Sequence, residues 1–412
     1  MRPPLDELLA AVSGERMAAT VAALAAESFA GRRVGSAGGA AARAWLGGRL
    51  ADLGAEVSFE PFGVAAIPEV YAKPSVTWHD GHTVHTLRFG RQVAVHPASA
   101  EQPLVRRGAL GNAGRTTPSD RWLVVPAGMR LFDAFGHGDG AIGLIIGRDV
   151  DGDGWQYTML AGPGPGPLPV LAVDTDTHAA LQSAAERGTG WLAGNTPIRR
   201  LDLPAANVHG RWRPGTDLLL TAHYDGVGDL PGLRQPAAAD NASGVAVVLE
   251  TARVLSSALP AGVGLTVALL DAEEAGALGS AHHAAQLRHN AATPMVINVD
   301  GAGCLHETVA VEAGGPAHAL LAVLDQAGRH TGLPLAAGPV ASDNRRYAAA
   351  GFAAVGIGAG MAGYHSPADT PDRVETATLT AVARLVVATA WHAAARPHHL
   401  TSPPFIFDRS SS

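Results

Sequence analysis

Apolar residues at helical spacing mark both ends of the chain. In residues 5–28 they recur every three or four positions and are interrupted at Ser13-Gly14, which predicts two short helices. A second pattern covers AARAWLGGRLADLGAEV and stops near Gly54, a residue type that often follows a helix. Further amphipathic stretches predict helices at 177–188, 241–258, 317–330 and 377–396.

Short, continuous apolar runs alternate with the helices in the second half of the chain. LLLTAH, GLTVALLDAEEAG, PMVINVDGAG and FAAVGIG are apolar, short and followed by turn residues, as expected of strands buried on both faces. Strand and helix alternation predicts an α/β fold, a mixed sheet with helices on both faces in three α/β/α layers. Residues 206–223 are expected to form a hairpin within this sheet.

The segment from 65 to 205 has a different pattern. VTWHDGHTVHTLRF predicts a hairpin around Asp80-Gly81, and WLVVPAG, AIGLIIG and LPVLAVD predict short buried strands. We therefore expect a smaller β-rich domain inserted into the larger one. The predicted division is 1–64 for the first part of the larger domain, 65–205 for the insert, 206–396 for the rest of the larger domain and 397–412 for a loose tail.

Composition and charge limit the classes of function. The 412 residues are 47% hydrophobic and 16% charged, as in globular proteins. A net charge of -7 without a basic cluster argues against nucleic acid as a partner. No apolar run approaches the roughly 20 residues that span a bilayer, and the N-terminal segment lacks the features of a signal peptide. We expect a cytoplasmic protein that does not bind membranes; its oligomeric state is not predicted.

Residues suited to metal binding follow four of the predicted strands. In open α/β sheets, ligands bind outside the carboxyl ends of the strands, so side chains at these ends are expected to converge. A further carboxylate stands at the start of the helix predicted at 241–258. These candidates are His223, Asp240, Glu273, Glu274, Asp300 and His365.

Two imidazoles and three carboxylates suit two divalent ions that share one carboxylate. Cys304 is the only cysteine, so a metal site has to use histidine and carboxylate ligands and no internal disulfide can form. A further carboxylate beside the metals can act as a general base. From the residues alone, Glu273 and Glu274 are exchangeable between the roles of base and ligand.

The chain resembles the co-catalytic zinc aminopeptidases, a family that also includes glutamate carboxypeptidase II, the transferrin receptor and glutaminyl cyclases. The matching pieces occur in the family's order: GRRVGSAGG, TAHYDG, AADNASGVA, LLDAEEAGALGS, INVDGAG, SDNRRYAAAGFAAVGIG and GYHSPADTPDRV. Residues 104–182 are similar, more weakly, to the protease-associated insert of many members. The long, Pro-rich loop between His223 and Asp240 departs from the family pattern and leaves the substrate preference open.

The resemblance implies a role for each matching residue. Two zinc ions are implied, with His223 and Asp300 as terminal ligands of one metal. Glu274 and His365 would be the terminal ligands of the other, and Asp240 the bridge. The peptide between Asp240 and Asn241 would be cis.

Three further roles follow from the resemblance. Glu273 would be the general base, and Asp225 would orient His223. Tyr364 would stabilise the oxyanion. The implied substrates are peptides with a free N-terminus.

Other functions remain open on the same residues. A carboxypeptidase or a glutaminyl cyclase could use the same site, and a non-catalytic receptor could keep the fold; since all five ligand positions and the base are filled, hydrolysis is favoured. Some further patterns resemble known sites. His79, His82 and His85 are interpreted as polar hairpin positions, and the sequence gives Cys304 no nucleophilic role.

Two more patterns need an alternative explanation. Asp149, Asp151 and Asp153 resemble the start of a calcium loop, but Leu160 stands where the closing glutamate belongs. A polar turn is therefore expected there. Gly358, Gly360 and Gly363 form G-x-G-x-x-G but precede His365 rather than a helix, which predicts an active-site loop instead of a nucleotide site.

Overall fold

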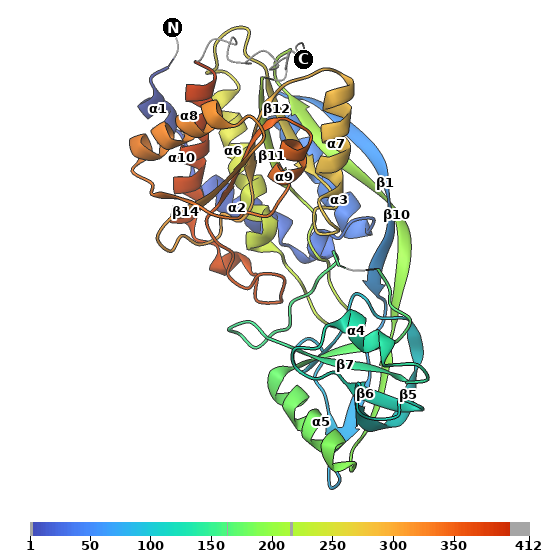
Figure 1. Cartoon of the computed structure of the whole chain (residues 1–412). Helices are drawn as coiled ribbons and strands as arrows, with labels where there is room; N and C mark the ends of the chain where they lie inside the picture. Colours follow the sequence, from blue (N-terminus) through green and yellow to red (C-terminus); the bar gives the residue numbers. More distant parts are fainter. Residues whose placement is uncertain (1–2, 163, 215–216, 396–412) are drawn as a thin grey trace, which may run out of the picture.

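Two mixed β-sheets divide the molecule into an upper and a lower lobe (Figure 1). The computed structural model describes residues 3–162, 164–214 and 217–395. The sheet of the upper lobe has the strand order β1-β10-β12-β11-β13-β16-β14-β15. These strands are β1 (Glu56–Val70), β10 (Ile198–Arg211), β11 (Leu218–His223), β12 (Leu265–Leu270), β13 (Met295–Val299), β14 (Val309–Gly314), β15 (Leu335–Ala337) and β16 (Ala353–Gly358).

Helices cover both faces of this sheet, which confirms the predicted α/β/α arrangement. Leu218 and Leu220 of β11 lie in one hydrophobic core and Leu219 lies in the other. The strand has to be apolar throughout because both of its faces are covered. The first core includes residues of α1 (Leu5–Ala10), α2 (Gly14–Leu24), α3 (Ala37–Asp52), α6 (Ser243–Leu255), α8 (His318–Thr331) and α10 (Thr376–Ala393). The second includes residues of α7 (Leu278–His289) and α9 (Asn344–Ala349).

Four central strands of the upper sheet are parallel. β11 pairs in parallel with β12 and β13, and β13 pairs in parallel with β16. β1 with β10, β10 with β12, and β14 with β16 are antiparallel, so the sheet is mixed. The carboxyl ends of β12, β11, β13 and β16 therefore meet at one edge of the sheet, where a ligand crevice is expected.

The predicted hairpin at 206–223 is wrong. β10 and β11 both belong to the upper sheet, but β12 lies between them, antiparallel to β10 and parallel to β11. Sequence proximity favours direct pairing of consecutive strands. Here the later strand β12 is apolar on both faces and takes the central position.

The lower lobe has its own sheet with the order β3-β2-β9-β5-β6-β7-β8-β4. The predicted hairpin around Asp80-Gly81 is confirmed, because β2 and β3 pair antiparallel. The helix predicted at 177–188 is α5 (Thr175–Arg187), capped by Asp174. The other elements are β2 (Val76–His79), β3 (Val84–Thr86), β4 (Val93–Val95), β5 (Gln102–Asn112), β6 (Arg121–Val124), α4 (Leu131–Gly136), β7 (Gly143–Arg148), β8 (Val170–Asp174) and β9 (Trp191–Thr196).

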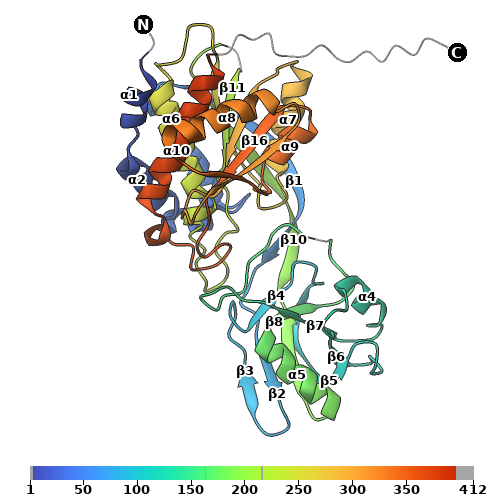
Figure 2. The same cartoon turned by 60° about the vertical axis from the view of Figure 1, so that its left-hand side comes forward.

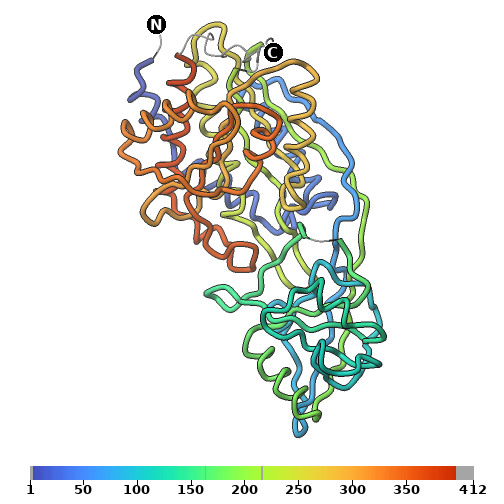
Figure 3. Tube along the Cα trace, viewed as in Figure 1, coloured from blue at the N-terminus to red at the C-terminus, as the bar shows by residue number. Residues whose placement is uncertain are grey.

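The long antiparallel strands β1 and β10 connect the two lobes (Figure 2). Their pairing extends from Glu56 opposite Arg211 to Val70 opposite Ile198. Both strands continue across the predicted domain limits at 64/65 and 205/206, with a shift in the pairing register between Val64 and Ile67. These limits stay predictions. The tube in Figure 3 shows the same two segments side by side along the molecule. In the part of the chain that the structure describes, no helix has the length and apolar character needed to span a bilayer.

Candidate metal centre

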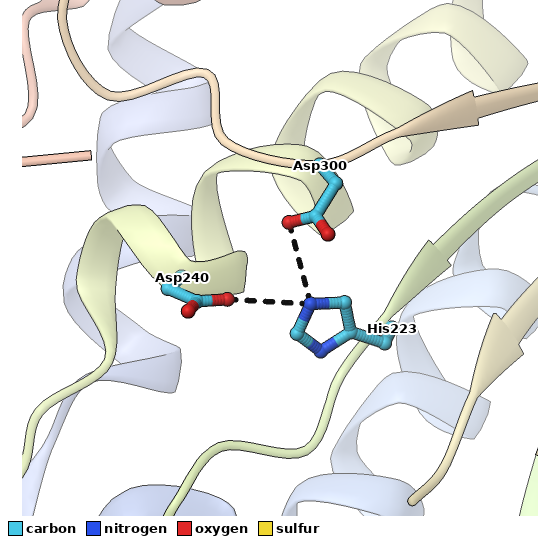
Figure 4. Close-up of side chains that lie close together, drawn as sticks. All are labelled: His223, Asp240 and Asp300. Carbon is cyan, nitrogen blue, oxygen red and sulfur yellow. Dashed lines mark hydrogen bonds and ion pairs between the residues drawn. The ribbon is translucent and has the colours of Figure 1, made fainter. Parts of the chain in front are cut away.

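One group of candidate ligands gathers around the ring of His223 (Figure 4). His223 is the last residue of β11, and Asp300 follows β13. Asp240 lies in a short π-helical turn, Ala238–Ala242, directly before α6. The His223 Nε2 atom is 3.3 Å from Asp240 Oδ1 and 3.3 Å from Asp300 Oδ1. The three side chains are buried and come from different elements at one edge of the sheet.

A second group gathers around the ring of His365. His365 lies in the loop after β16, and Glu274 lies in the turn after β12. The His365 Nε2 atom is 3.0 Å from Asp240 Oδ2 and 2.8 Å from Glu274 Oε2. In each group, one ligand atom of every residue lies within 4.8 Å of the others. Asp240 belongs to both groups and presents a different oxygen to each histidine.

Backbone hydrogen bonds to two further carboxylates hold this arrangement. Asp225 accepts the N–H groups of Glu273 (3.0 Å) and Glu274 (3.2 Å), and its Oδ1 is 3.5 Å from His223 Nδ1. Asp369 accepts the N–H groups of residue 239 (2.6 Å) and of Asp240 (3.0 Å). The carboxylates thus fix the backbone that presents the candidate ligands. The Asp240–Asn241 peptide is cis, as the resemblance implied.

A buried arginine supports the loop that leads to Asp240. Arg32 is fully buried, and its guanidinium donates to the carbonyl oxygens of residues 24, 224, 236 and 237. All of these partners are backbone atoms, so Arg32 fixes the loop without pairing directly with a carboxylate of the centre. Its charge still acts on Asp369, Asp225 and Asp240 over a longer distance.

The buried charges of the centre perturb its titratable groups. Burial alone would lower the pKa of His223, yet the carboxylates of Asp300 and Glu273 raise it well above its usual value. The pKa of His365 is raised in the same way, against the effect of burial, by Glu274 and Asp240. Burial raises the pKa of Glu274 to about 7. Without a cation, the centre therefore favours protonated groups over a full set of charges.

The residues present fit divalent metal ions. The simpler explanation for the cluster is ion pairing between its carboxylates and the two imidazoles. The carboxylates outnumber the imidazoles, however, and buried unpaired charge is costly. Glu274 Oε1 is buried and has no hydrogen-bond partner among the described residues. A cavity of about 10 Å³ lies beside Asp240, Glu274 and His365, roughly the space of one water-sized sphere. Imidazole nitrogen and carboxylate oxygen form the donor set that zinc accepts.

Glu273 and Tyr364 lie beside the two groups. Glu273 Oε2 is 4.0 Å from His223 Nε2, and the Glu273 side chain is 16% exposed, against 3% for Glu274. Burial raises the pKa of Glu273 well above its usual value. The ring of Tyr364 stacks on His365 with centroids 3.7 Å apart. Glu273 is thus the more accessible of the two glutamates, and Tyr364 flanks the second group.

His365 itself has a left-handed backbone with φ of 52°. Such a conformation costs a non-glycine residue about 1–2 kcal/mol and persists where the surroundings hold it. Its carbonyl oxygen accepts the N–H of Thr158, which belongs to the lower lobe. The second lobe therefore takes part in holding a candidate ligand.

The other sequence patterns have structural roles in the described residues. Each acid of the calcium-like segment already has a partner: Asp149 with Thr175, Asp151 with the N–H groups of Asp153 and Trp155, and Asp153 with Arg373. His79 and His85 stack on tryptophans of the lower lobe. Gly358 is followed by the loop that carries His365. Burial raises the pKa of Cys304, which does not favour a nucleophilic thiolate.

Sequence reasoning missed three contributors to the centre. Asp369 lies within GYHSPADTPDRV and Arg32 within GRRVGSAGG, so both were in matching segments but had no assigned role. Met159 of the lower lobe has its sulfur 3.2 Å from His365 Nδ1. No local pattern marks Met159, because its contact depends on how the two lobes meet.

Comparisons with known proteins show which family and which folds the chain is similar to. The model of peptidase family M28 matches residues 207–390. Among solved structures, a zinc aminopeptidase from Bacillus subtilis, BSAP, is 20% identical with a TM-score of 0.72, over 93% of this chain and 95% of the other. An aminopeptidase from Aneurinibacillus sp. strain AM-1 is 20% identical with a TM-score of 0.71, over 95% and 96%.

A third structure extends the range of chemistry on this fold. A glutaminyl cyclase from Porphyromonas gingivalis is 16% identical with a TM-score of 0.53, over 92% of this chain and 98% of the other. At these identities the solved structures establish the fold. No curated protein sequence matches the chain.

The family match covers the part of the chain that forms the centre. Both histidines and every carboxylate of the two groups lie inside the matched segment. The fold of the chain is similar to that of the solved zinc aminopeptidase. The segment that forms the centre, residues 207–390, is therefore the part of the chain that is similar to peptidase family M28.

Proposed function

We propose that the protein is an aminopeptidase that binds two divalent ions, zinc by preference, and releases the N-terminal residue of peptides. The observation that carries the proposal is the position of Asp240, whose two oxygens face His223 and His365 from one carboxylate. A carboxylate placed between two imidazoles suits two metal ions that share one ligand. His223 and Asp300 would hold one ion, and His365 and Glu274 the other.

Bound zinc would polarise the scissile carbonyl and lower the pKa of a water molecule. The remaining work falls to side chains of this chain. Glu273 would take a proton from the attacking water and deliver it to the leaving amine nitrogen. Its greater exposure, relative to Glu274, supports this assignment. Asp225 would hold His223 and the Glu273–Glu274 turn in place.

Two further features support exopeptidase chemistry on peptides. Tyr364 stacks on His365 at the exposed side of the second group, where its hydroxyl would donate to the oxyanion. Carboxylate oxygens beside the metals would accept hydrogen bonds from the α-amino group of a peptide. A free N-terminus is thus the end of the peptide that would lie at the centre.

The test combines metal analysis with a substrate panel. The purified protein is expected to contain about two zinc ions per chain and to hydrolyse aminoacyl p-nitroanilides, with activity lost in chelator and restored by zinc. The same substrates with a blocked α-amino group are the control. Hydrolysis only of peptides with a free C-terminus would indicate a carboxypeptidase. Pyroglutamate from N-terminal glutamine would indicate a cyclase, and absence of metal and turnover would favour a binding protein.

A further inference from the structure

A segment of the lower lobe, residues 149–162 between β7 and β8, contacts the loop that carries His365. Ser366 donates from its hydroxyl to Asp151 Oδ2 (2.8 Å), and Arg373 pairs with Asp153. From the upper lobe, the side-chain amide of Gln235 donates to the Thr158 hydroxyl (2.9 Å). In Figure 3 this segment lies at the junction of the two lobes. We call it the junction segment.

The junction segment also contacts His365 itself. The N–H of Thr158 donates to the His365 carbonyl oxygen (2.8 Å), and the sulfur of Met159 is 3.2 Å from His365 Nδ1. The carbonyl oxygen and the Nδ1 atom of His365 thus both face residues of the lower lobe. Because His365 has a left-handed backbone, these contacts act on a residue that would otherwise favour another conformation.

The two candidate ligand histidines differ in what faces their Nδ1 atoms. His223 Nδ1 is 3.2 Å from the carbonyl oxygen of Asp225 and 3.5 Å from its carboxylate. His365 Nδ1 faces the thioether of Met159. A histidine that binds metal through Nε2 keeps a proton on Nδ1 and normally donates it to a carboxylate or carbonyl, which raises its basicity as a ligand. A thioether is a weak acceptor.

We propose that the junction segment is a positioning element of the catalytic centre, in which Met159 accepts the Nδ1–H of His365 and Asp151 and Asp153 hold the loop around it. The proposal rests on the proposed two-metal function. It implies that the ion held by His365, Glu274 and Asp240 binds more weakly than the ion held by His223, Asp300 and Asp240. It also implies that the affinity for the more weakly bound ion depends on contacts from the lower lobe.

The test is a zinc titration of the metal-free, full-length protein against a chromogenic chelator. Met159→Leu keeps the size of the side chain and removes the acceptor; Met159→Gln offers a stronger acceptor of similar length. We expect Met159→Leu to weaken the lower-affinity site by roughly 3–10-fold, less than the 10–100-fold typical when a carboxylate partner is removed. The zinc affinity of the tighter site should not change. Met159→Gln should restore the zinc affinity of the weaker site.

A matched control lies on the same segment. Asp149 pairs with Thr175 within the lower lobe, so Asp149→Asn changes the segment without touching the catalytic loop. Equal titrations for Met159→Leu and Asp149→Asn would overturn the proposal. Equal weakening of both sites by Met159→Leu would also overturn it, because that result indicates general destabilisation. A wild-type protein that binds fewer than two ions would instead contradict the proposed function itself.

The carboxylates of the segment give a second readout. Asp151→Asn and Asp153→Asn together are expected to speed amide hydrogen exchange in residues 363–373 and to lower kcat more than they raise KM. With cobalt bound in place of zinc, the visible spectrum of this double variant should differ from that of the wild type. The spectrum of cobalt-loaded Met159→Leu should differ in the same direction. If exchange and spectrum both match those of Asp149→Asn, the carboxylates have no positioning role and the proposal fails.

Discussion

Two groups of carboxylates lie near the junction of the lobes, and they differ in their surroundings. In the candidate metal centre, Asp240, Glu274 and Asp300 are each no more than 6% exposed and face imidazole nitrogens. In the calcium-like segment, Asp151 and Asp153 are partly or fully exposed and bind backbone N–H groups, Ser366 and Arg373. Both groups have residue types suited to a cation.

The comparison shows what turns acidic residues into candidate ligands. The spacing of Asp149, Asp151 and Asp153 is local, and each carboxylate finds a separate partner in a polar turn. The acids of the metal centre are far apart in the sequence and are brought together by the edge of a parallel sheet. Burial removes water as a partner, so their oxygens have to share a cation or a proton. Four experiments test this contrast.

The largest effect is expected from loss of the shared carboxylate. Asp240→Ala removes an oxygen from both groups, so metal content should fall below one ion per chain and kcat/KM should fall on the order of 10³-fold or more. Elemental analysis and initial rates measure these changes, with Asp149→Asn as the control. Activity close to that of the wild type would exclude Asp240 as the bridge.

The two adjacent glutamates should separate in a second experiment. Glu273→Gln is expected to keep both metals and lower kcat by roughly 10²–10⁴-fold, the range for loss of a general base. Glu274→Gln should lose metal from the second group as well as activity. Metal content and kcat measured on the same preparations distinguish them. Metal loss in Glu273→Gln would show that the two roles are exchanged.

The stability of the metal-free protein should depend on pH. Burial raises the pKa of Glu274, Asp343 and Asp369 to about 7 each, whereas in the unfolded chain they titrate near about 4. Between these values the folded protein keeps protons that the unfolded chain releases, so the stability they contribute is lost as pH rises through about 4 to 7. Thermal denaturation in chelator should give a falling Tm from about pH 5 to 8. Zinc should restore it.

The lowered pKa of Asp240 does not reverse the predicted fall of stability with rising pH. The pKa of Asp240 is lowered, since hydrogen bonds to His223 and His365 outweigh its burial. Its contribution is therefore lost only at acidic pH, below this window. The raised pKa values of the two histidines add to the loss above about pH 6.5. A Tm of the metal-free protein that rises across the window would contradict the predicted balance of buried charge.

The smallest effect is expected from calcium. Since the acids at 149–153 have protein partners, millimolar calcium should shift the Tm of the zinc-loaded protein by less than about 1 °C. The Asp149→Asn variant should respond in the same way. A rise of several degrees that Asp149→Asn abolishes would mean that the segment binds calcium after all.

Much of the fold follows from local patterns. The helices α5, α8 and α10 and the hairpin of β2 and β3 lie close to their predicted positions, because period and turn residues are properties of short segments. α9 (Asn344–Ala349) was not predicted, since six residues carry too little periodicity to mark a helix. The pairing of β10 with β12 was also not predicted, because strand order depends on segments far apart in the chain. The protease-associated character of the lower lobe and the cytoplasmic location stay predictions.

The kinds of residues available to the centre, and the strand ends that carry them, can be identified from the sequence alone. Apolar runs that end in His223, Asp300 and the Glu273–Glu274 pair already predicted a shared edge, because parallel strands place their carboxyl ends together. Only the tertiary structure decided which oxygen of Asp240 faces which imidazole and that Met159 lies against His365. Such contacts join segments up to about 200 residues apart, and their geometry is set by the packing of whole sheets and lobes.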